Sequence, residues 1–241
     1  MRLRRPSAAS SRVAQVSVAV LVPAAGRGER LGPGAPKALR EVGGEPLLRH
    51  ALRSLGAAPE VDLLVVAGPP GDLAATEAAC AGTGALVVAG GTDRRASVAA
   101  ALRALPPEVD VVLVSDAARP FVPVELVQRV VATVAAGAPA VVPGLPVADT
   151  VKQVDGTGHV VATPPRELLR AVQTPQGFAR VVLERAHALP AELLVTDDAG
   201  LVEALGLPVL VVPGAPEAFK VTRPEDVEAA EALLRRRGAG R

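Results

Sequence analysis

The stretch that decides the fold runs from Val18 to Lys37 and reads VAVLVPAAGRGERLGPGAPK. It opens with an apolar run, Val18 to Val22, and continues into a loop rich in glycine and in cationic residues. This order is typical of a strand that presents a loop to an anionic ligand. Glycines let backbone N–H groups approach a phosphate closely, and the cations neutralise its charge. The stretch therefore indicates a phosphate-binding loop.

Two familiar phosphate loops do not fit this stretch. A Walker loop places Gly-Lys-Ser/Thr after its glycines, whereas Lys37 follows Pro36 at the far end of the loop. The dinucleotide-binding fingerprint fails at its third glycine, because Leu31 stands there, one residue short of Gly32. A surface turn rich in Gly and Pro is the remaining alternative, so the rest of the chain must decide.

Composition narrows the class of protein. The 241 residues, of which 49% are hydrophobic, are enough for one large α/β domain with a sizeable core. The aromatic content of 1% and the net charge of +1 argue against a nucleic-acid or anionic-membrane partner. The only cysteine, Cys80, excludes an intramolecular disulfide and a multi-cysteine zinc site, and it fits a reducing cytoplasm. We expect a cytoplasmic protein with no nucleic-acid and no membrane partner.

The N-terminal residues are basic, contain no acid and are rich in Ser and Ala. A transit or signal segment has such a composition, but the apolar run that follows is needed as a strand. We interpret residues 1–15 as a disordered basic tail, or as a start site placed too far upstream, and residues 16–236 as a single domain.

From Val18 onward, apolar runs alternate with segments of helical periodicity. Such alternation predicts a mostly parallel sheet covered by helices on both faces, a Rossmann-like three-layer αβα sandwich with a twisted sheet. Strands are predicted at 18–22, 62–68, 85–91, 109–120 (ending in a polar turn), 139–147 and 208–214, and helical segments at 46–58, 71–80, 94–105, 123–138, 174–189 and 196–206. A short strand around Phe219 and a helix with Pro224 in its first turn complete the chain.

Residues 148–166 break this alternation, because they form two extended runs around the turn signal Asp155-Gly156. We predict a β-hairpin arm spanning about 146–168. An isolated two-stranded arm is marginally stable in water, so a second subunit is its natural partner and we expect a homodimer.

Ligands of such sheets gather at the carboxyl ends of the strands. Asp116 ends a strand and is placed to hold Mg²⁺ against a nucleoside triphosphate, although a turn aspartate is an equal alternative. Arg119 could contact a phosphate of a second substrate or pair with an acid. The stretch from Gly90 to Val98, GGTDRRASV, could contact a base through its backbone and hydroxyl groups, or form a simple helix cap.

Lysine usage adds a clue, because only Lys37, Lys152 and Lys220 are lysines among the 26 cationic residues. The three that remain are candidates for positions that require a compact ammonium group; chance retention is the alternative. Lys220, on a late short segment, could stabilise charge on an α-phosphate. His50, His159 and His187 show no ligand spacing and are interpreted as surface or helix residues.

Taken together, these motifs resemble the sugar-phosphate nucleotidyltransferases, and most closely the 2-C-methyl-D-erythritol 4-phosphate cytidylyltransferase family. The resemblance runs from Val18 to about Arg236. It rests on PAAGRGER with Pro36-Lys37, GGTDRRASV, SDAARP, PVADTVK, TPQGF, VTDDA and FKVTRPED, in the family's order. The chain departs from the family at Glu217-Ala218, where Asp-Asn is common, and at Ala148, where Arg is common.

The resemblance implies roles for individual residues. The nucleotide-binding set would be Ala24, Ala25, Gly26, Gly28, Gly91, Thr92, Arg94 and Ser97. The catalytic set would be Arg30 and Lys37, which bind the triphosphate, and Lys220, which contacts the α-phosphate. The substrate-binding set would be Asp116, which also coordinates Mg²⁺, together with Arg119, Thr150, Arg166 and Thr196. Thr150 and Arg166 would reach from the arm into the partner's site.

The implied reaction transfers CMP from CTP to 2-C-methyl-D-erythritol 4-phosphate and releases pyrophosphate, a step in non-mevalonate isoprenoid precursor synthesis. It needs little proton transfer, so positioning and charge stabilisation by cations suffice. Ribitol 5-phosphate or another polyol or sugar phosphate is the alternative acceptor. A non-catalytic nucleotide-binding module is the alternative of another class, and the presence of Arg30, Lys37, Asp116 and Lys220 together speaks against it.

Overall fold

A mixed β-sheet runs through the middle of the molecule. The computed structural model describes residues 16–26, 36–193 and 195–239. The sheet contains β1 (Ser17–Pro23), β4 (Leu63–Gly68), β5 (Leu86–Ala89), β6 (Val109–Val114), β7 (Ala140–Pro146), β10 (Arg170–Val172), β11 (Gln176–Ala179) and β12 (Val209–Pro213). Their order is β10-β7-β11-β6-β1-β4-β5, with β12 paired to β7.

Most of the strand pairs in this sheet are parallel. β1 pairs in parallel with β4 and β6, and the pairs β4–β5 and β7–β12 are also parallel. β11 is antiparallel to both β6 and β7, and β10 is antiparallel to β7. The mostly parallel sheet predicted from the alternating pattern is confirmed, with two antiparallel strands that the pattern did not reveal.

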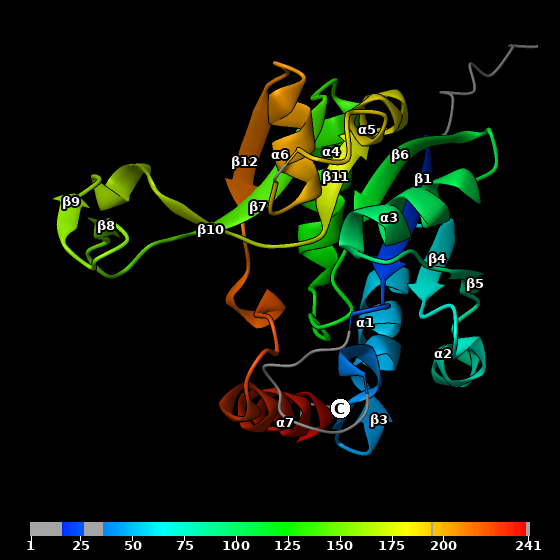
Figure 1. Cartoon of the computed structure of the whole chain (residues 1–241). Helices are drawn as coiled ribbons and strands as arrows, with labels where there is room; N and C mark the ends of the chain where they lie inside the picture. The colour runs from blue at the N-terminus through cyan, green and yellow to red at the C-terminus, as the bar shows by residue number, and fades with distance from the viewer. Residues whose placement is uncertain (1–15, 27–35, 194, 240–241) are drawn as a thin grey trace, which may run out of the picture.

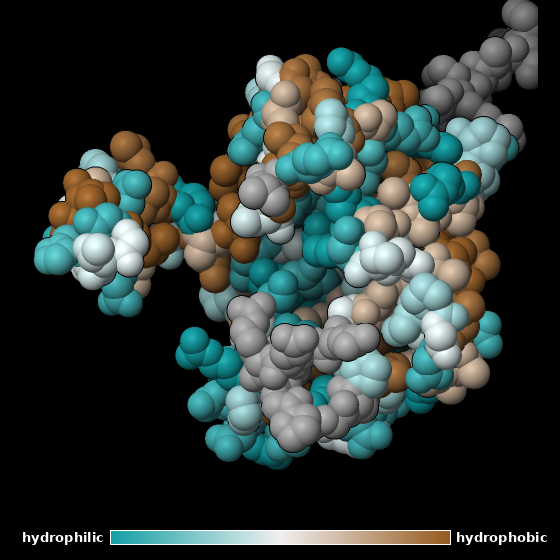
Figure 2. Space-filling view, in the orientation of Figure 1, coloured by the Kyte–Doolittle hydropathy of each residue, from teal (hydrophilic) through white to brown (hydrophobic). Residues whose placement is uncertain are grey.

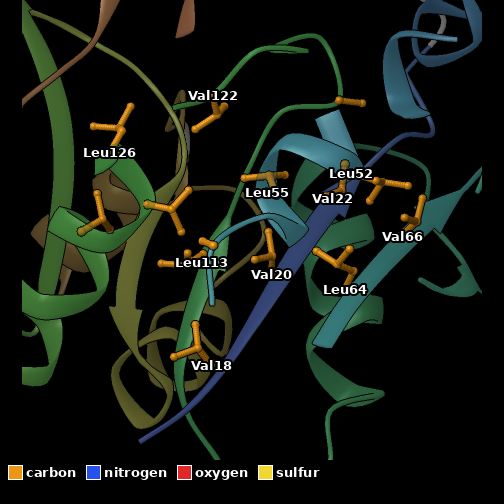
Figure 3. Close-up of a cluster of buried hydrophobic side chains, with 14 of the residues drawn as sticks. Val18, Val20, Val22, Leu52, Leu55, Leu64, Val66, Leu113, Val122 and Leu126 are labelled. Atoms are coloured by element: carbon orange, nitrogen blue, oxygen red, sulfur yellow. The ribbon is translucent and has the colours of Figure 1, made fainter. Parts of the chain in front are cut away.

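Helices cover both faces of the sheet (Figure 1). They are α1 (Leu47–Gly56), α2 (Leu73–Cys80), α3 (Arg94–Arg103), α4 (Val124–Ala135), α5 (Arg180–His187) and α6 (Asp198–Ala204). Because side chains alternate along a strand, Val20 of β1 packs with α1, α2 and α4, whereas Leu21 packs with α3, α5 and α6. Figure 3 shows the first of these two cores, with Val20 between Leu55, Leu64 and Leu113. The three-layer sandwich is confirmed.

Two details of the sequence prediction are wrong. The helix expected over 174–189 begins only at Arg180, because Gln176–Ala179 form β11 between β6 and β7. Phe178 of this strand is fully buried in the core against α5 and α6. The short strand expected around Phe219 is also absent from the described residues: Val221 N–H donates one backbone hydrogen bond to the Ala118 carbonyl, and no ladder forms there.

The predicted hairpin arm is present. β8 (Gln153–Val154) and β9 (Val160–Ala162) pair antiparallel, and they lie at the end of two extended segments that carry them away from the sandwich (Figure 1). All residues of both strands are exposed, and Figure 2 shows brown, apolar residues on this arm. The exposed set includes Val154, Val160 and Val161.

A third, small core lies below the sheet, where α7 (Pro224–Ala239) packs against a short hairpin. The hairpin is β2 (Glu41–Val42) with β3 (Glu45–Pro46), and it turns at Gly43 and Gly44, whose φ angles of 60° and 79° favour glycine. The 3₁₀ turns η2 (Lys37–Leu39), η3 (Arg166–Leu168) and η4 (Pro216–Ala218) complete the secondary structure. Across the described ranges, no helix is both long and apolar enough to cross a bilayer.

Candidate active site

A cavity of about 550 Å³ opens at the carboxyl ends of β1, β5 and β6. Figure 2 looks onto this part of the molecule and shows a hollow with teal, hydrophilic residues on its floor. The lining residues are Pro23, Ala24, Ala25, Gly26, Lys37, Ala38, Gly91, Thr92, Asp93, Arg94, Ser97, Asp116, Ala117, Ala118 and Lys220. Most of the nucleotide-binding candidates, and the cations Lys37 and Lys220, are therefore brought together in one pocket, at the edge of the sheet that the strand order predicts.

The loop after β5 forms one wall of this pocket through a set of local hydrogen bonds. Ser97 Oγ accepts the Gly91 N–H at 3.1 Å and donates to the Asp93 carbonyl at 2.8 Å. Asp93 Oδ1 accepts the Ala96 N–H at 2.7 Å and so caps α3. A Cβ atom on Gly91 would overlap Ala96, so only glycine fits where the loop turns into the helix. Residues 90–98 therefore both form the helix cap that the sequence offered as one interpretation and build a wall of the pocket.

Asp116 is surrounded by cations at the floor of the pocket. Its Oδ2 atom lies 2.7 Å from Lys220 Nζ and 3.8 Å from Arg119 Nε, and its Oδ1 atom lies 3.7 Å from Arg94 Nε. The Asp116 N–H donates to Thr174 Oγ1 at 3.0 Å, which fixes the backbone from which the carboxylate projects. These contacts bring residues from three distant parts of the chain around one carboxylate.

The electrostatics of this cluster keep Asp116 ionised. Burial disfavours its charged form, but Lys220, Arg94 and Arg119 outweigh burial and hold the pKa of Asp116 below its usual value. Burial alone would lower the pKa of Arg94, yet the carboxylates of Asp198 and Asp116 raise it. For Arg119, burial dominates and lowers the pKa, with Asp116 opposing.

Arg119 does not line the cavity, and its Nε lies 3.8 Å from Asp116 Oδ2. Its side chain is buried, and its Nη1 donates to the Ala218 carbonyl at 2.6 Å. Its Nε has no hydrogen-bond partner within the described part of the protein. Position 218, where the family commonly has Asn, is thus a buried alanine that contributes its backbone carbonyl to Arg119.

The other predicted site residues lie away from the pocket or outside the described residues. Thr150 and Thr196 are exposed and are not among its lining residues. Arg166, at the base of the arm, donates to the Ala148 carbonyl at 2.6 Å. Gly28 and Arg30 lie outside the described residues.

Sequence reasoning missed Asp198 and Thr174 as site residues. Asp198 Oδ2 accepts from Arg94 Nη1 at 2.6 Å, and Oδ1 lies 2.9 Å from His187 Nε2. Burial disfavours its ionisation, but His187 and Arg94 outweigh it and hold the pKa of Asp198 below its usual value. The motifs VTDDA and TPQGF contain both residues. No local pattern pairs Asp198 with Arg94, because the contact exists only after the chain has folded.

Comparison with known proteins assigns the chain to a family. A sequence model of the 2-C-methyl-D-erythritol 4-phosphate cytidylyltransferases, IspD, matches residues 18–236. The chain belongs to the IspD family. The 2-C-methyl-D-erythritol 4-phosphate cytidylyltransferase of Frankia casuarinae is 59% identical over 224 residues, covering 93% of this chain and 84% of the relative. That of Streptomyces coelicolor is 55% identical over 231 residues, covering 91% and 85%.

Solved structures agree with the IspD assignment. The 2-C-methyl-D-erythritol 4-phosphate cytidylyltransferase from Thermus thermophilus superimposes with a TM-score of 0.76 at 43% identity, covering 91% of this chain and 100% of the other. The 4-diphosphocytidyl-2C-methyl-D-erythritol synthase from Anaerococcus prevotii gives a TM-score of 0.80 at 29% identity, covering 92% and 99%. The IspD resemblance of the motifs, and the fold it implied, are confirmed.

Proposed function

We propose that this chain transfers CMP from CTP to 2-C-methyl-D-erythritol 4-phosphate, releasing pyrophosphate, in non-mevalonate isoprenoid precursor synthesis. The chain belongs to the IspD family. The observation that carries this function is its pocket, in which Lys220 Nζ lies 2.7 Å from Asp116 Oδ2, next to the loop that contains Gly91. The pocket's described wall carries more cations than acids: Lys37, Arg94 and Lys220 against Asp93 and Asp116. This balance suits a triphosphate.

In the proposed reaction, a phosphate oxygen of the acceptor attacks the α-phosphorus of CTP in line. A new bond forms between this oxygen and the α-phosphorus. The bond between the α-phosphorus and the oxygen that bridges the α- and β-phosphates breaks, and pyrophosphate leaves with that electron pair. The acceptor phosphate is already an anion, so no general base is required. Lys220, and Lys37 with Arg30, would stabilise the charge that builds on the phosphoryl oxygens.

The nucleotide would lie against the two loops at the ends of β1 and β5. Ala24, Ala25, Gly26 and the undescribed Gly28 would contact it from one side, and Gly91, Thr92, Arg94 and Ser97 from the other. Ser97 already uses its hydroxyl twice within the loop, so it acts mainly by fixing the wall that the base meets. Among the described residues, no atom lies within 4 Å of a Cβ built on Gly26, so a side chain there would narrow the approach of the nucleotide to the pocket.

We also propose Mg²⁺ as the cofactor, held by Asp116. The described residues contain no group of three His, Cys, Asp or Glu side chains suited to a metal. One carboxylate nevertheless fits Mg²⁺, which is commonly bound by one or two carboxylates together with substrate phosphates and water. When bound with the nucleotide, the ion would neutralise charge on the phosphates. Asp116, which lines the cavity, would bind the acceptor on the same subunit together with Arg119 and Thr196, neither of which lines the cavity before substrate binds.

The protein would act as a homodimer through the arm at about 146–168. Support comes from the exposed valines of the hairpin and from the position of Thr150 and Arg166, which lie on the arm and do not line the pocket of their own chain. A reducing cytoplasmic location is proposed because Cys80 is the only cysteine of the sequence and its thiol is free and buried.

Pyrophosphate release with CTP and Mg²⁺ tests the function. 2-C-methyl-D-erythritol 4-phosphate and ribitol 5-phosphate are compared as acceptors, and Lys37→Ala serves as the matched inactive variant. A clear preference for the first acceptor is expected. A preference for ribitol 5-phosphate would move the chain to polyol-conjugate synthesis, and no release with either would support a nucleotide-binding module without catalysis.

A further inference from the structure

Arg94 lies between two carboxylates and is held much more closely by one of them. Its Nη1 donates to Asp198 Oδ2 at 2.6 Å, whereas its Nε lies 3.7 Å from Asp116 Oδ1, beyond hydrogen-bond distance. The side chain of Arg94 is 34% exposed and lines the nucleotide pocket. Asp198 is therefore the anchor of a cation that the pocket needs.

Asp198 is built into the fold and does not line the pocket itself. Its side chain is 1% exposed, and its second oxygen, Oδ1, lies 2.9 Å from His187 Nε2. Because an ionised carboxylate can only accept, the Nε2 atom of His187 carries the proton. His187 Nδ1 has no hydrogen-bond partner within the described chain. Both oxygens of Asp198 are thus occupied, one by α5 and one by α3.

We propose that Asp198, braced by His187, is a positioning residue that holds Arg94 on the nucleotide wall and keeps it from closing onto Asp116. The inference deepens the proposed function, since it takes Arg94 as a nucleotide ligand and Asp116 as a residue of the acceptor site. Neither Asp198 nor His187 touches the cavity, so each acts only through Arg94.

Coulomb attraction explains why the anchor is needed. Among the described residues, Asp116 Oδ1 is the nearest other carboxylate oxygen to the guanidinium, and Arg–carboxylate pairs favour close, two-point contact. Without Asp198, the guanidinium of Arg94 would gain electrostatic attraction by rotating toward Asp116 Oδ1. The other oxygen of Asp116, Oδ2, already pairs with Lys220. That rotation would remove a cation from the nucleotide wall and would also cover the carboxylate. Loss of Asp198 should therefore harm the enzyme more than loss of Arg94.

The test compares Asp198→Asn, Arg94→Gln and the double variant with the full-length wild type. Calorimetric affinity for CTP should fall by about tenfold or more in all three, as expected for loss of a hydrogen bond to a charged group. Turnover should fall furthest in Asp198→Asn and should recover in the double variant to the level of Arg94→Gln, because the misplaced cation is gone. A merely structural role for Asp198 predicts no such recovery.

Controls separate this inference from instability and from the proposed function. Glu184→Gln on α5 breaks an exposed ion pair with Arg180 and should leave CTP affinity unchanged. His187→Ala removes the contact to Asp198 Oδ1 and should weaken CTP binding relative to wild type, though less than a folded Asp198→Asn does. If Asp198→Asn does not fold, unchanged CTP affinity in His187→Ala would overturn the inference. Unchanged CTP affinity in folded Asp198→Asn, or a double variant worse than both single ones, would overturn the inference. A wild type that turns over neither acceptor would instead contradict the proposed function.

Discussion

Lys220 Nζ lies 2.7 Å from Asp116 Oδ2, joining the segment before α7 to the end of β6. The Asp116 carboxylate holds the ammonium at the pocket floor, where 38% of the lysine side chain remains exposed. In the proposed reaction the same ammonium would contact the α-phosphate. Asp116 therefore positions this cation before the nucleotide binds.

Replacing Lys220 with Gln should abolish most turnover and leave the fold intact. Removal of one preorganised charge-stabilising group typically lowers kcat by about 10²–10³. Pyrophosphate release measures the loss, and circular dichroism checks the fold. Arg235→Gln, which removes an exposed cation paired with Glu231 on α7, is the matched control and should be unaffected. Near-normal turnover in Lys220→Gln would remove this lysine from the mechanism.

The buried carboxylates predict how stability depends on pH. The native pKa values of Asp116 and Asp198 are lowered from the ordinary value of 3.8, because cationic partners and His187 outweigh burial. Above that ordinary value both carboxylates are ionised in the native and unfolded chains, and their stabilisation is fully present. As the pH falls through 3.8 and below, the unfolded chain binds protons first, so the free energy of unfolding declines.

Urea denaturation from neutral pH down to about 3 measures this decline. Asp198→Asn should be less stable at neutral pH and should show a shallower decline in the acid range, because one of the groups responsible is gone. Glu217→Gln removes an exposed carboxylate and should keep the wild-type slope. A slope for Asp198→Asn equal to that of wild type would show that Asp198 is not responsible for the acid sensitivity.

The sequence revealed those parts of the fold that follow from local pattern. Runs such as Val18–Val22 are recognisable because a strand buried on both faces is continuously apolar. The position of the pocket could be predicted from these strands, since the loops at the carboxyl ends of parallel strands lie close together. Lys37, Gly91 and Asp116 could be placed in one site on this argument alone, and the structure puts all three in one cavity.

What the sequence could not reveal depends on partners far away in the chain. Gln176–Ala179 continue directly into a helix, and only the open edges of β6 and β7 make them a strand. The ion pair between Arg94 and Asp198 likewise requires α3 and α6 to be brought together. Such contacts leave no periodic signal, so the local pattern predicts a helix where β11 lies and does not mark Asp198 as a site residue.

Gly177 in β11 allows a stability measurement to test whether packing against the rest of the fold holds this strand in place. A Cβ atom there would overlap Val130 Cγ1 and lie 3.0 Å from Val134 Cγ2, both on α4. Gly177→Ala should therefore destabilise the protein by about 1–3 kcal/mol through overpacking. Gly156→Ala in the hairpin turn, where a Cβ would meet no atom of the described residues within 4 Å, should be nearly neutral. Equal stability of the two variants would contradict the tight packing of β11 on α4.

Arg166 tests the proposed exchange of arms between subunits. Its Nη1 atom ties the two ends of the arm together by donating to the Ala148 carbonyl, and the residue lines no part of its own pocket. Arg166→Ala should raise the KM for the sugar phosphate and leave the KM for CTP unchanged. Arg170→Ala removes a nearby exposed guanidinium that bonds only local carbonyls among the described residues, and it should leave both KM values unchanged.

Mixed dimers make this prediction decisive. When Arg166→Ala is combined with Lys220→Gln, one of the two pockets has an intact Lys220 from its own chain and an intact Arg166 from the partner's arm. Activity should therefore reappear in the mixture, although each variant alone is impaired. If Arg166 served the pocket of its own chain, each pocket in the mixed dimer would carry one defect and no activity would return. Recovery thus requires both a dimer and an arm that crosses between its subunits.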